Sequence, residues 1–143
     1  MWILSLISGM IALTSLITPA WGIIVSSYSF FVWFWGLEVS TDLGIRIVST
    51  PFLILGIIAS ILILMSGLLL IYISYKNYKD KTKYKKLWII LGIIIILAPI
   101  IYIVGLEILF PSFFGEYKPV TIFIGPVISS ILAILAGVIV KRQ

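Results

Sequence analysis

Long apolar runs alternate with short polar segments along this chain. Four of the runs reach the length of about 20 mostly apolar residues that a bilayer-spanning helix needs. They cover residues 2–24, 52–75, 87–109 and 120–140. Glu107, near the end of the third run, is the one charged residue inside them. The pattern predicts an all-α membrane protein in which residues 1–143 form a single domain, a four-transmembrane-helix bundle.

Charge is distributed unequally over the segments between the runs. Segment 76–86 carries six lysines and one aspartate, a net charge of +5, and Lys141 and Arg142 raise that side to +7. Segments 25–51 and 110–119, taken with the acid of the third run, sum to −2. Basic residues favour the cytoplasmic side. We therefore expect a multi-pass cell-membrane protein with both termini and segment 76–86 in the cytoplasm, and with 25–51 and 110–119 as extracellular loops.

A cleaved signal peptide is the alternative interpretation of the first run. Thr18, Pro19 and Ala20 could pass for a cleavage site. However, no basic n-region precedes the run, and the apolar stretch is too long for a signal peptide. We therefore expect this run to be a membrane span.

Residues 30–40, FFVWFWGLEVS, do not fit a membrane span. A helix that continued from the first run through this segment would be about 54 Å long, well beyond a hydrocarbon core of about 30 Å. Because aromatic and β-branched residues favour strands, we predict a strand over residues 30–39 in a small extracellular sheet. A lone strand leaves its backbone groups unpaired. We therefore expect an antiparallel partner just after Trp21, with residues 22–28 the nearest candidate and 43–48 the next.

The predicted strand is apolar on both faces. Alternation would place Phe31, Trp33, Trp35 and Leu37 on one face, and Phe30, Val32, Phe34 and Gly36 on the other. The helix bundle and the outer leaflet can cover one face, and the other needs a different cover. An exposed aromatic patch marks an interaction site. We therefore expect partner contact through Phe30, Phe31, Trp33, Phe34 and Trp35.

Composition removes most kinds of chemistry from consideration. The chain is 62% hydrophobic and has neither cysteine nor histidine. This removes disulfides, thiolate nucleophiles, imidazole bases and the usual zinc, haem and iron–sulfur ligands. The five acidic residues are scattered and form no catalytic or metal-binding motif, so we expect a protein that is not an enzyme and has no cofactor. The net charge of +5 comes from lysines beside the spans, so we expect no nucleic-acid partner.

Two further features concern the spans themselves. Small residues recur every four positions along the fourth run, at Gly125, Ser129, Ala133 and Gly137. This spacing lets helix backbones approach closely in lipid, and we expect the stripe to pack inside its own bundle rather than between subunits. An acid in an apolar setting such as Glu107 is a candidate for transport or ligand binding. Its place near the outer end instead favours a structural or interfacial role, with Arg46 as its partner.

Two short motifs lie near the outer end of the first run and after it. TPAW ends at Trp21, and VWFWGLEVS contains Gly36 and Leu37. With these motifs and a small-residue last span that has a basic end, the chain resembles the claudin and peripheral-myelin-protein-like tetraspan family. That family has a Trp just after its first span and a Gly-Leu pair in its first loop. The resemblance implies four spans, cytoplasmic termini and a first-loop sheet that mediates contacts, with Trp21 packed beneath it. Glu38 stands where the family has Trp, and the family's two cysteines are missing.

These observations favour a structural protein that acts by assembly. We expect it to bind membrane lipids and to assemble as a homo-oligomer or with other membrane proteins, as in cell adhesion, through the aromatic loop and the small-residue helix faces. The alternatives are an accessory subunit of a larger membrane complex, or a small oligomeric channel, transporter or lipid-handling protein with Glu107 and Arg46 along its path. A polar stripe facing the bundle interior would mark the last class, and the sequence offers only scattered serines and threonines.

Overall fold

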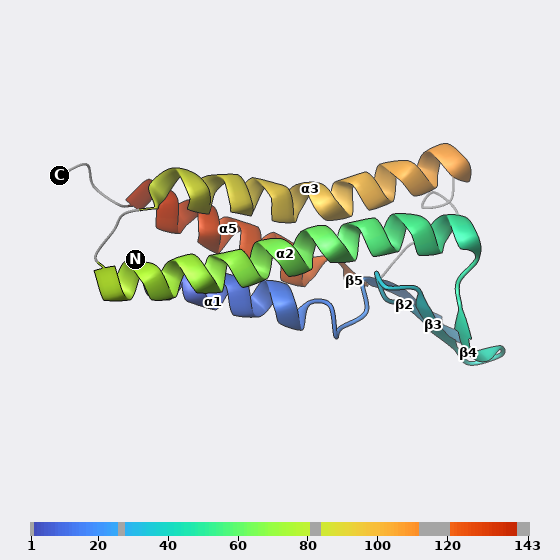
Figure 1. Ribbon diagram of the computed structural model, residues 1–143. Helices are drawn as coiled ribbons and strands as arrows, with labels where there is room; N and C mark the ends of the chain where they lie inside the picture. The colour runs from blue at the N-terminus through green and yellow to red at the C-terminus, as the bar shows by residue number, and fades with distance from the viewer. Residues whose placement is uncertain (1, 26–27, 81–83, 112–120, 140–143) are drawn as a thin grey trace.

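The computed structural model describes residues 2–25, 28–80, 84–111 and 121–139. In this part of the chain the helices are α1 (Trp2–Thr14), α2 (Thr50–Asp80), α3 (Lys85–Leu109) and α5 (Ile124–Ile139) (Figure 1). The strands are β1 (Trp21–Val25), β2 (Tyr28–Val32), β3 (Leu37–Ser40), β4 (Gly44–Ile47) and the two-residue β5 (Thr121–Ile122). The prediction of a mostly helical protein with a small sheet between its first two helices is confirmed.

The helices form an up-and-down bundle. α1 packs against α2 and α5, and α3 packs against the same two helices. The end of α2 and the start of α3 lie at one end of the bundle, together with the start of α1 and the end of α5 (Figure 1). The strands gather at the opposite end, beside the first turns of α2. The fold therefore holds the lysine-rich ends of α2 and α3 far from the sheet.

α2 and α3 are the two described helices that are long and apolar enough to cross a membrane. α2 has 31 residues because it continues past the second predicted run into the lysine-rich segment. α3 has 25 residues and covers the third run. α1 and α5 are shorter, with 13 and 16 residues. Spanning length is therefore present in two helices, where the sequence predicted four.

The predicted outer end of the first span, at residue 24, was wrong. The helix ends at Thr14, and by Trp21 the chain has entered β1. The Ser15 hydroxyl donates a hydrogen bond to a carbonyl three residues earlier, a local bond that competes with the helical ladder. Pro19 has no N–H with which to continue a helix. Residues 21–24 therefore belong to the sheet and not to a span.

The sheet has the strand order β4-β3-β2-β1-β5, and its neighbouring strands are antiparallel. β1 to β4 form a meander between α1 and α2, and β5 adds the segment before α5 to the other edge of β1. The predicted antiparallel pairing between a strand just after Trp21 and the aromatic segment is confirmed for residues 30–32, because β1 pairs with β2 along its whole length. The second candidate segment, 43–48, contributes β4, which pairs with β3.

The single strand predicted over residues 30–39 was wrong, because the chain reverses at residues 33–36. The N–H of Gly36 donates to the carbonyl of Trp33 at 3.0 Å and closes a turn between β2 and β3. Gly36 has a φ of 97°, which glycine adopts at little cost because it has no Cβ. The two faces predicted for one continuous strand are therefore interrupted at this turn.

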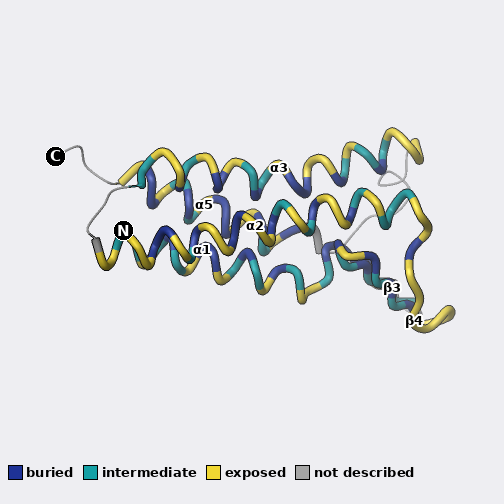
Figure 2. Tube along the Cα trace, viewed as in Figure 1, coloured by how far each residue is buried: buried dark blue, intermediate teal, exposed yellow. Residues whose placement is uncertain are grey.

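Buried positions line the inside of the bundle and exposed positions lie on its outside (Figure 2). Small side chains share the interior with large ones such as Trp88, Tyr102 and Leu70, and large apolar side chains cover the surface. The buried serines and alanines of the helices are Ser5, Ser8, Ala12, Ala59, Ser66, Ser74, Ala98, Ser129, Ser130, Ala133 and Ala136. Exposed side chains along the same helices include Ile54, Ile61, Met65, Leu68, Ile93, Ile101 and Ile131. Small residues at helix contacts and an apolar exterior are the arrangement that helices adopt in lipid.

Candidate functional site

The turn between β2 and β3 anchors the sheet on the bundle. Phe34 is 1% exposed, and its ring lies edge-on to Tyr102 of α3 and stacked on Phe123, with centroid distances of 5.4 and 5.3 Å. The backbone of Phe34 lies directly on Gly56 of α2, where any Cβ would overlap the Phe34 carbonyl oxygen. We call this contact of Phe34 with Tyr102, Phe123 and Gly56 the seat of the sheet. It needs both an aromatic cluster and a glycine.

The residue that leads into α5 completes this cluster. Phe123 has a φ of 50°, a left-handed conformation that is uncommon for a bulky side chain. Its N–H donates to the carbonyl of Ala20 at 3.0 Å, just before β1. Such a conformation persists where the surroundings fix it. The start of α5 is therefore tied to the start of the sheet.

Trp21 lies on the side of the sheet that faces the bundle. Its side chain is fully buried, and its ring contacts Phe30 of β2 at a centroid distance of 5.3 Å. Its indole N–H points to the hydroxyl of Tyr102 across 3.5 Å. Trp21 thus connects β1, β2 and α3 within the monomer.

Two indoles of the turn hold the segment that follows α1. The Trp33 Nε1–H donates to the carbonyl of Ile17 at 2.6 Å, and the Trp35 Nε1–H donates to the carbonyl of Leu16 at 2.9 Å. Carbonyls beyond the end of a helix lack helical partners, so these bonds satisfy groups that α1 leaves open. Trp35 is still 47% exposed.

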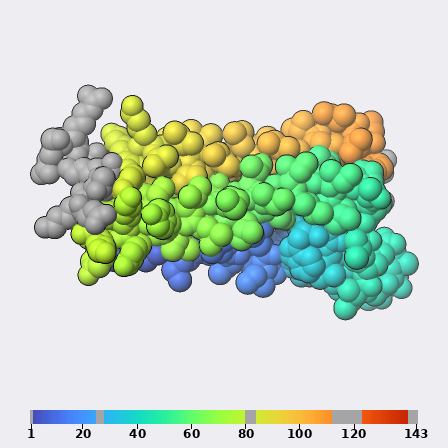
Figure 3. Space-filling view, in the orientation of Figure 1, coloured from blue at the N-terminus to red at the C-terminus, as the bar shows by residue number. Residues whose placement is uncertain are grey.

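The opposite side of the sheet is apolar and open. We define the outer sheet face as the side chains that alternation and register place together there, namely Ile24, Phe31, Leu37, Val39, Ile45 and Ile47. Ile24, Ile45 and Ile47 are 58%, 75% and 71% exposed. In the space-filling view the sheet projects from the end of the bundle (Figure 3). These three isoleucines therefore leave much of their apolar surface uncovered on this side of the sheet.

The five aromatic residues predicted as an interaction surface are therefore divided between the two sides. Phe34 belongs to the core, and Phe30 packs inward between Trp21 and Tyr28. Phe31 lies on the outer sheet face, and Trp33 and Trp35 lie in the turn. The prediction did not include Ile24, Ile45 and Ile47. The alternation of Ile45 and Ile47 within segment 43–48 was the signal for the last two.

Glu38 and Arg46 form an ion pair across β3 and β4. The Arg46 Nε–H donates to Oε1 of Glu38 at 2.5 Å, and the two residues are register partners. The Glu38 side chain is 5% exposed and that of Arg46 is 50% exposed. Arg46 thus has Glu38 as its partner, in place of the Glu107 that we expected. Glu38, which the sequence analysis noted only as a departure from a motif, is the buried acid of this site.

Half of the small-residue stripe of α5 packs against the α1 side of the bundle. The Ser8 hydroxyl donates to the Ser129 carbonyl at 2.7 Å, and the Ser129 hydroxyl donates to the Ser8 carbonyl at 2.8 Å. Gly125 lies against Ser15, with no room for a Cβ between them. These reciprocal bonds satisfy polar groups that lie fully inside the bundle.

The other half of the stripe packs against α3. Gly92 lies so close to Ala133 that a Cβ on the glycine would be 3.1 Å from the alanine Cβ. A Cβ on Gly137 would lie 2.5 Å from Cγ1 of Ile89. Ser129, Ala133 and Gly137 therefore contact other helices of the same chain, and Gly125 contacts the segment that follows α1.

The described part of the chain places no three His, Cys, Asp or Glu side chains where they could hold a metal ion together. The sites that the structure does form are the seat of the sheet, the outer sheet face and the Glu38–Arg46 pair. Comparisons of the chain with protein-family models, with curated proteins and with solved structures find no match.

Proposed function

We propose that this chain is a non-catalytic membrane protein in which all four helices cross the bilayer and the sheet lies outside it. The apolar exterior of the bundle and the small residues at its helix contacts support this proposal, because large apolar side chains are stable against lipid and small residues let helices pack closely. α1 and α5 are about 20 and 24 Å long, short of a hydrocarbon core of about 30 Å. The sheet adjoins these two helices at their outer ends, beside the longer α2.

The orientation follows from charge. The lysines at the end of α2 and the start of α3 lie at the end of the bundle remote from the sheet (Figure 1). Under the positive-inside rule that end faces the cytoplasm, and the sheet is then extracellular. A sheet between the first two helices, with Trp21 on its inner side, also fits the resemblance to the claudin and peripheral-myelin-protein-like family. Membership of that family remains part of the proposal.

The sheet then acts by assembly, with a second copy or with another membrane protein. The single observation that carries this function is the outer sheet face, which ends at the edge strand β4. Exposed apolar patches mark interaction sites, and an exposed strand edge is a template for another strand. β4 has both features, because it is an edge strand and carries the exposed apolar side chains of Ile45 and Ile47.

The bundle interior favours assembly over transport. The buried Ser8 and Ser129 bond to each other, and the buried Ser74 donates to the carbonyl of Leu70 at 2.6 Å. The serines are enclosed among alanine, glycine and larger apolar side chains. The bonds between Ser8 and Ser129 join α1 to α5, as serine hydroxyls do between helices in lipid, whereas the Ser74 bond lies within α2. These hydrogen bonds support a packing role for the three serines.

Replacing both Ile45 and Ile47 with threonine is expected to weaken assembly, raising the dissociation constant of the oligomer at least about tenfold. Threonine keeps the β-branched shape that strands favour but removes apolar area, and about 1.4 kcal/mol suffices for a tenfold change. The measurement is the oligomer fraction of detergent-solubilised protein against concentration, by native mass spectrometry or cross-linking. The matched control is Ile17→Thr, because Ile17 is 76% exposed at the same end but lies outside the sheet. Equal assembly of the double variant and the control would remove the outer sheet face as the interface.

A further inference from the structure

A cavity of about 520 Å³ opens between the inner side of the sheet and the start of α2. Its lining includes four aromatic residues, Trp21, Tyr28 and Phe30 of the sheet and Phe52 of α2. Trp21 is fully buried, and the other three are partly exposed. Glu38 and Arg46 line the same cavity. Its volume is in the range of small-molecule sites, and its combination of apolar wall and a few charged groups is typical of them.

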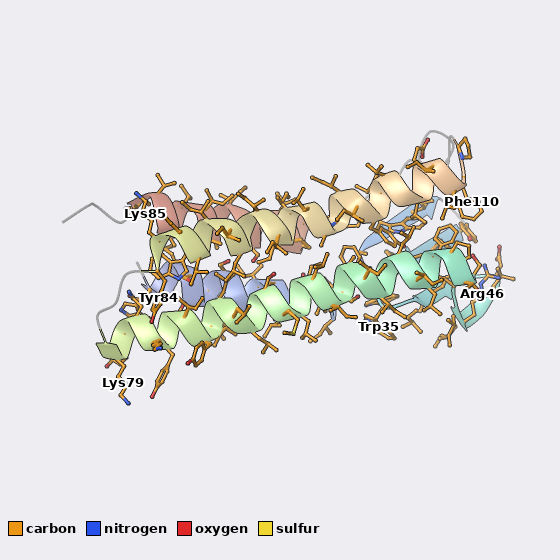
Figure 4. All side chains as sticks on the ribbon, turned by 45° about the horizontal axis from the view of Figure 1, so that its top comes forward. Trp35, Arg46, Lys79, Tyr84, Lys85 and Phe110 are labelled. Carbon is orange, nitrogen blue, oxygen red and sulfur yellow. The ribbon has the colours of Figure 1, made fainter. Side chains whose placement is uncertain are left out.

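The ion pair leaves binding capacity on both partners. The hydrogen bond that joins them uses Oε1 of Glu38 and Nε of Arg46. A carboxylate has a second oxygen, and a guanidinium has two further amino groups with four N–H donors. Glu38 is buried in the wall, whereas Arg46 is half exposed at the sheet end of the molecule (Figure 4). The cavity therefore offers one negative and one positive group side by side.

Each of these groups selects one half of a ligand. Aromatic faces beside a carboxylate attract an alkylammonium group, through cation–π contact and charge. A guanidinium attracts phosphate or carboxylate oxygens, which it can bind with two parallel hydrogen bonds. A ligand with only a cation would meet Arg46, and one with only an anion would meet Glu38, so each would be repelled by one group. A zwitterion matches both.

We propose that this cavity binds a small zwitterion that joins an alkylammonium group to an anionic oxygen group, as phosphocholine does. The ammonium lies among the aromatic rings beside Glu38, and the anionic group lies on Arg46. The ligand is either a soluble zwitterion or the headgroup of a zwitterionic lipid, since both present the same chemistry. This site lies on the inner side of the sheet, and Ile47 of the outer sheet face also borders it. Ligand binding at this site is a separate proposal from assembly through the outer sheet face.

The test is calorimetric titration of phosphocholine into protein purified in a non-ionic maltoside detergent. Saturable binding in the millimolar range or tighter is expected, with choline and inorganic phosphate each at least tenfold weaker. In parallel, native mass spectrometry compares the retention of phosphatidylcholine and phosphatidylglycerol. Binding of free phosphocholine identifies the zwitterion itself as sufficient, and selective retention of phosphatidylcholine alone identifies a lipid headgroup.

Variants separate the site from general effects on folding. Glu38→Gln is expected to weaken phosphocholine binding, or phosphatidylcholine retention, at least tenfold, and the uncharged pair Glu38→Gln with Arg46→Gln should lose it. The double variant carries the test if the single variant fails to fold, which gel filtration and thermal melting report. Asp42→Asn removes an equal charge from the exposed turn between β3 and β4 and should leave binding within twofold. Failure of both zwitterion probes, choline binding as tight as phosphocholine binding, or unchanged binding in the double variant would overturn the proposal.

Discussion

Phe34→Ala is expected to lower the free energy of unfolding by about 3–5 kcal/mol, the range for removing a fully buried phenylalanine. The ring is 1% exposed and contacts both Tyr102 and Phe123, so its loss leaves a cavity where the sheet, α3 and the start of α5 meet. The measurement is thermal or denaturant unfolding in detergent. Oligomer formation by the fraction that remains folded should change little, because the Phe34 side chain belongs to the core and not to the outer sheet face.

Phe31→Ala is the matched control for this variant. Phe31 lies three positions earlier but on the outer sheet face, where it is only partly buried. Its truncation should cost about 1 kcal/mol, in proportion to the smaller apolar area removed from water. If both phenylalanines proved equally dispensable for folding, Phe34 would not be the anchor of the sheet.

Gly56→Leu is expected to detach the sheet from α2. A Cβ at this position overlaps the carbonyl oxygen of Phe34 and lies 3.0 Å from its carbonyl carbon. Because these are backbone atoms, a rotamer change cannot relieve the overlap, and the turn or the helix must move. Overpacking of this kind costs about 3 kcal/mol. Hydrogen exchange should then show faster exchange in β2 and β3 than in the middle of α3.

Gly105→Leu tests whether the effect of Gly56 is specific. Gly105 lies in α3, and the three heavy atoms nearest to a Cβ there all belong to the Leu55 side chain, the closest at 2.9 Å. That side chain can change its rotamer, so the control variant should keep the sheet in place and lose less stability. Equal losses in the two variants would mean that any bulk between α2 and its neighbours is harmful, and that Gly56 has no special role under the sheet.

The sequence predicted the helical class, the existence of the sheet and the pairing that begins at Trp21, because these depend on long apolar runs and on strand propensity. It missed the turn at residues 33–36. Five aromatic residues favour a strand on propensity, and Gly36 alone carries the turn signal, through a φ of 97°. Tertiary packing decided the outcome, because the reversal lets Phe34 enter the core while β2 and β3 pair with each other.

The candidate site was predicted only in part, for a related reason. The sequence identified Arg46 and the aromatic segment as candidates. It paired Arg46 with Glu107, because Glu107 is the acid that lies within an apolar run. The burial of Glu38 depends on its register opposite Val32 and Arg46. Register follows from the turns at each end of β3, which local patterns left undefined. The cavity depends in addition on the placement of α2 against the sheet.

Side-specific labelling of single cysteines tests the central claim, a bundle that crosses the membrane and presents the sheet outside. The chain has no cysteine, so one can be introduced at Leu43, which is 57% exposed between β3 and β4, and another at Thr82 in the lysine-rich segment. In intact cells a membrane-impermeant maleimide should label Leu43→Cys and should reach Thr82→Cys only after the membrane is permeabilised. Labelling of both positions from the same side would contradict the account.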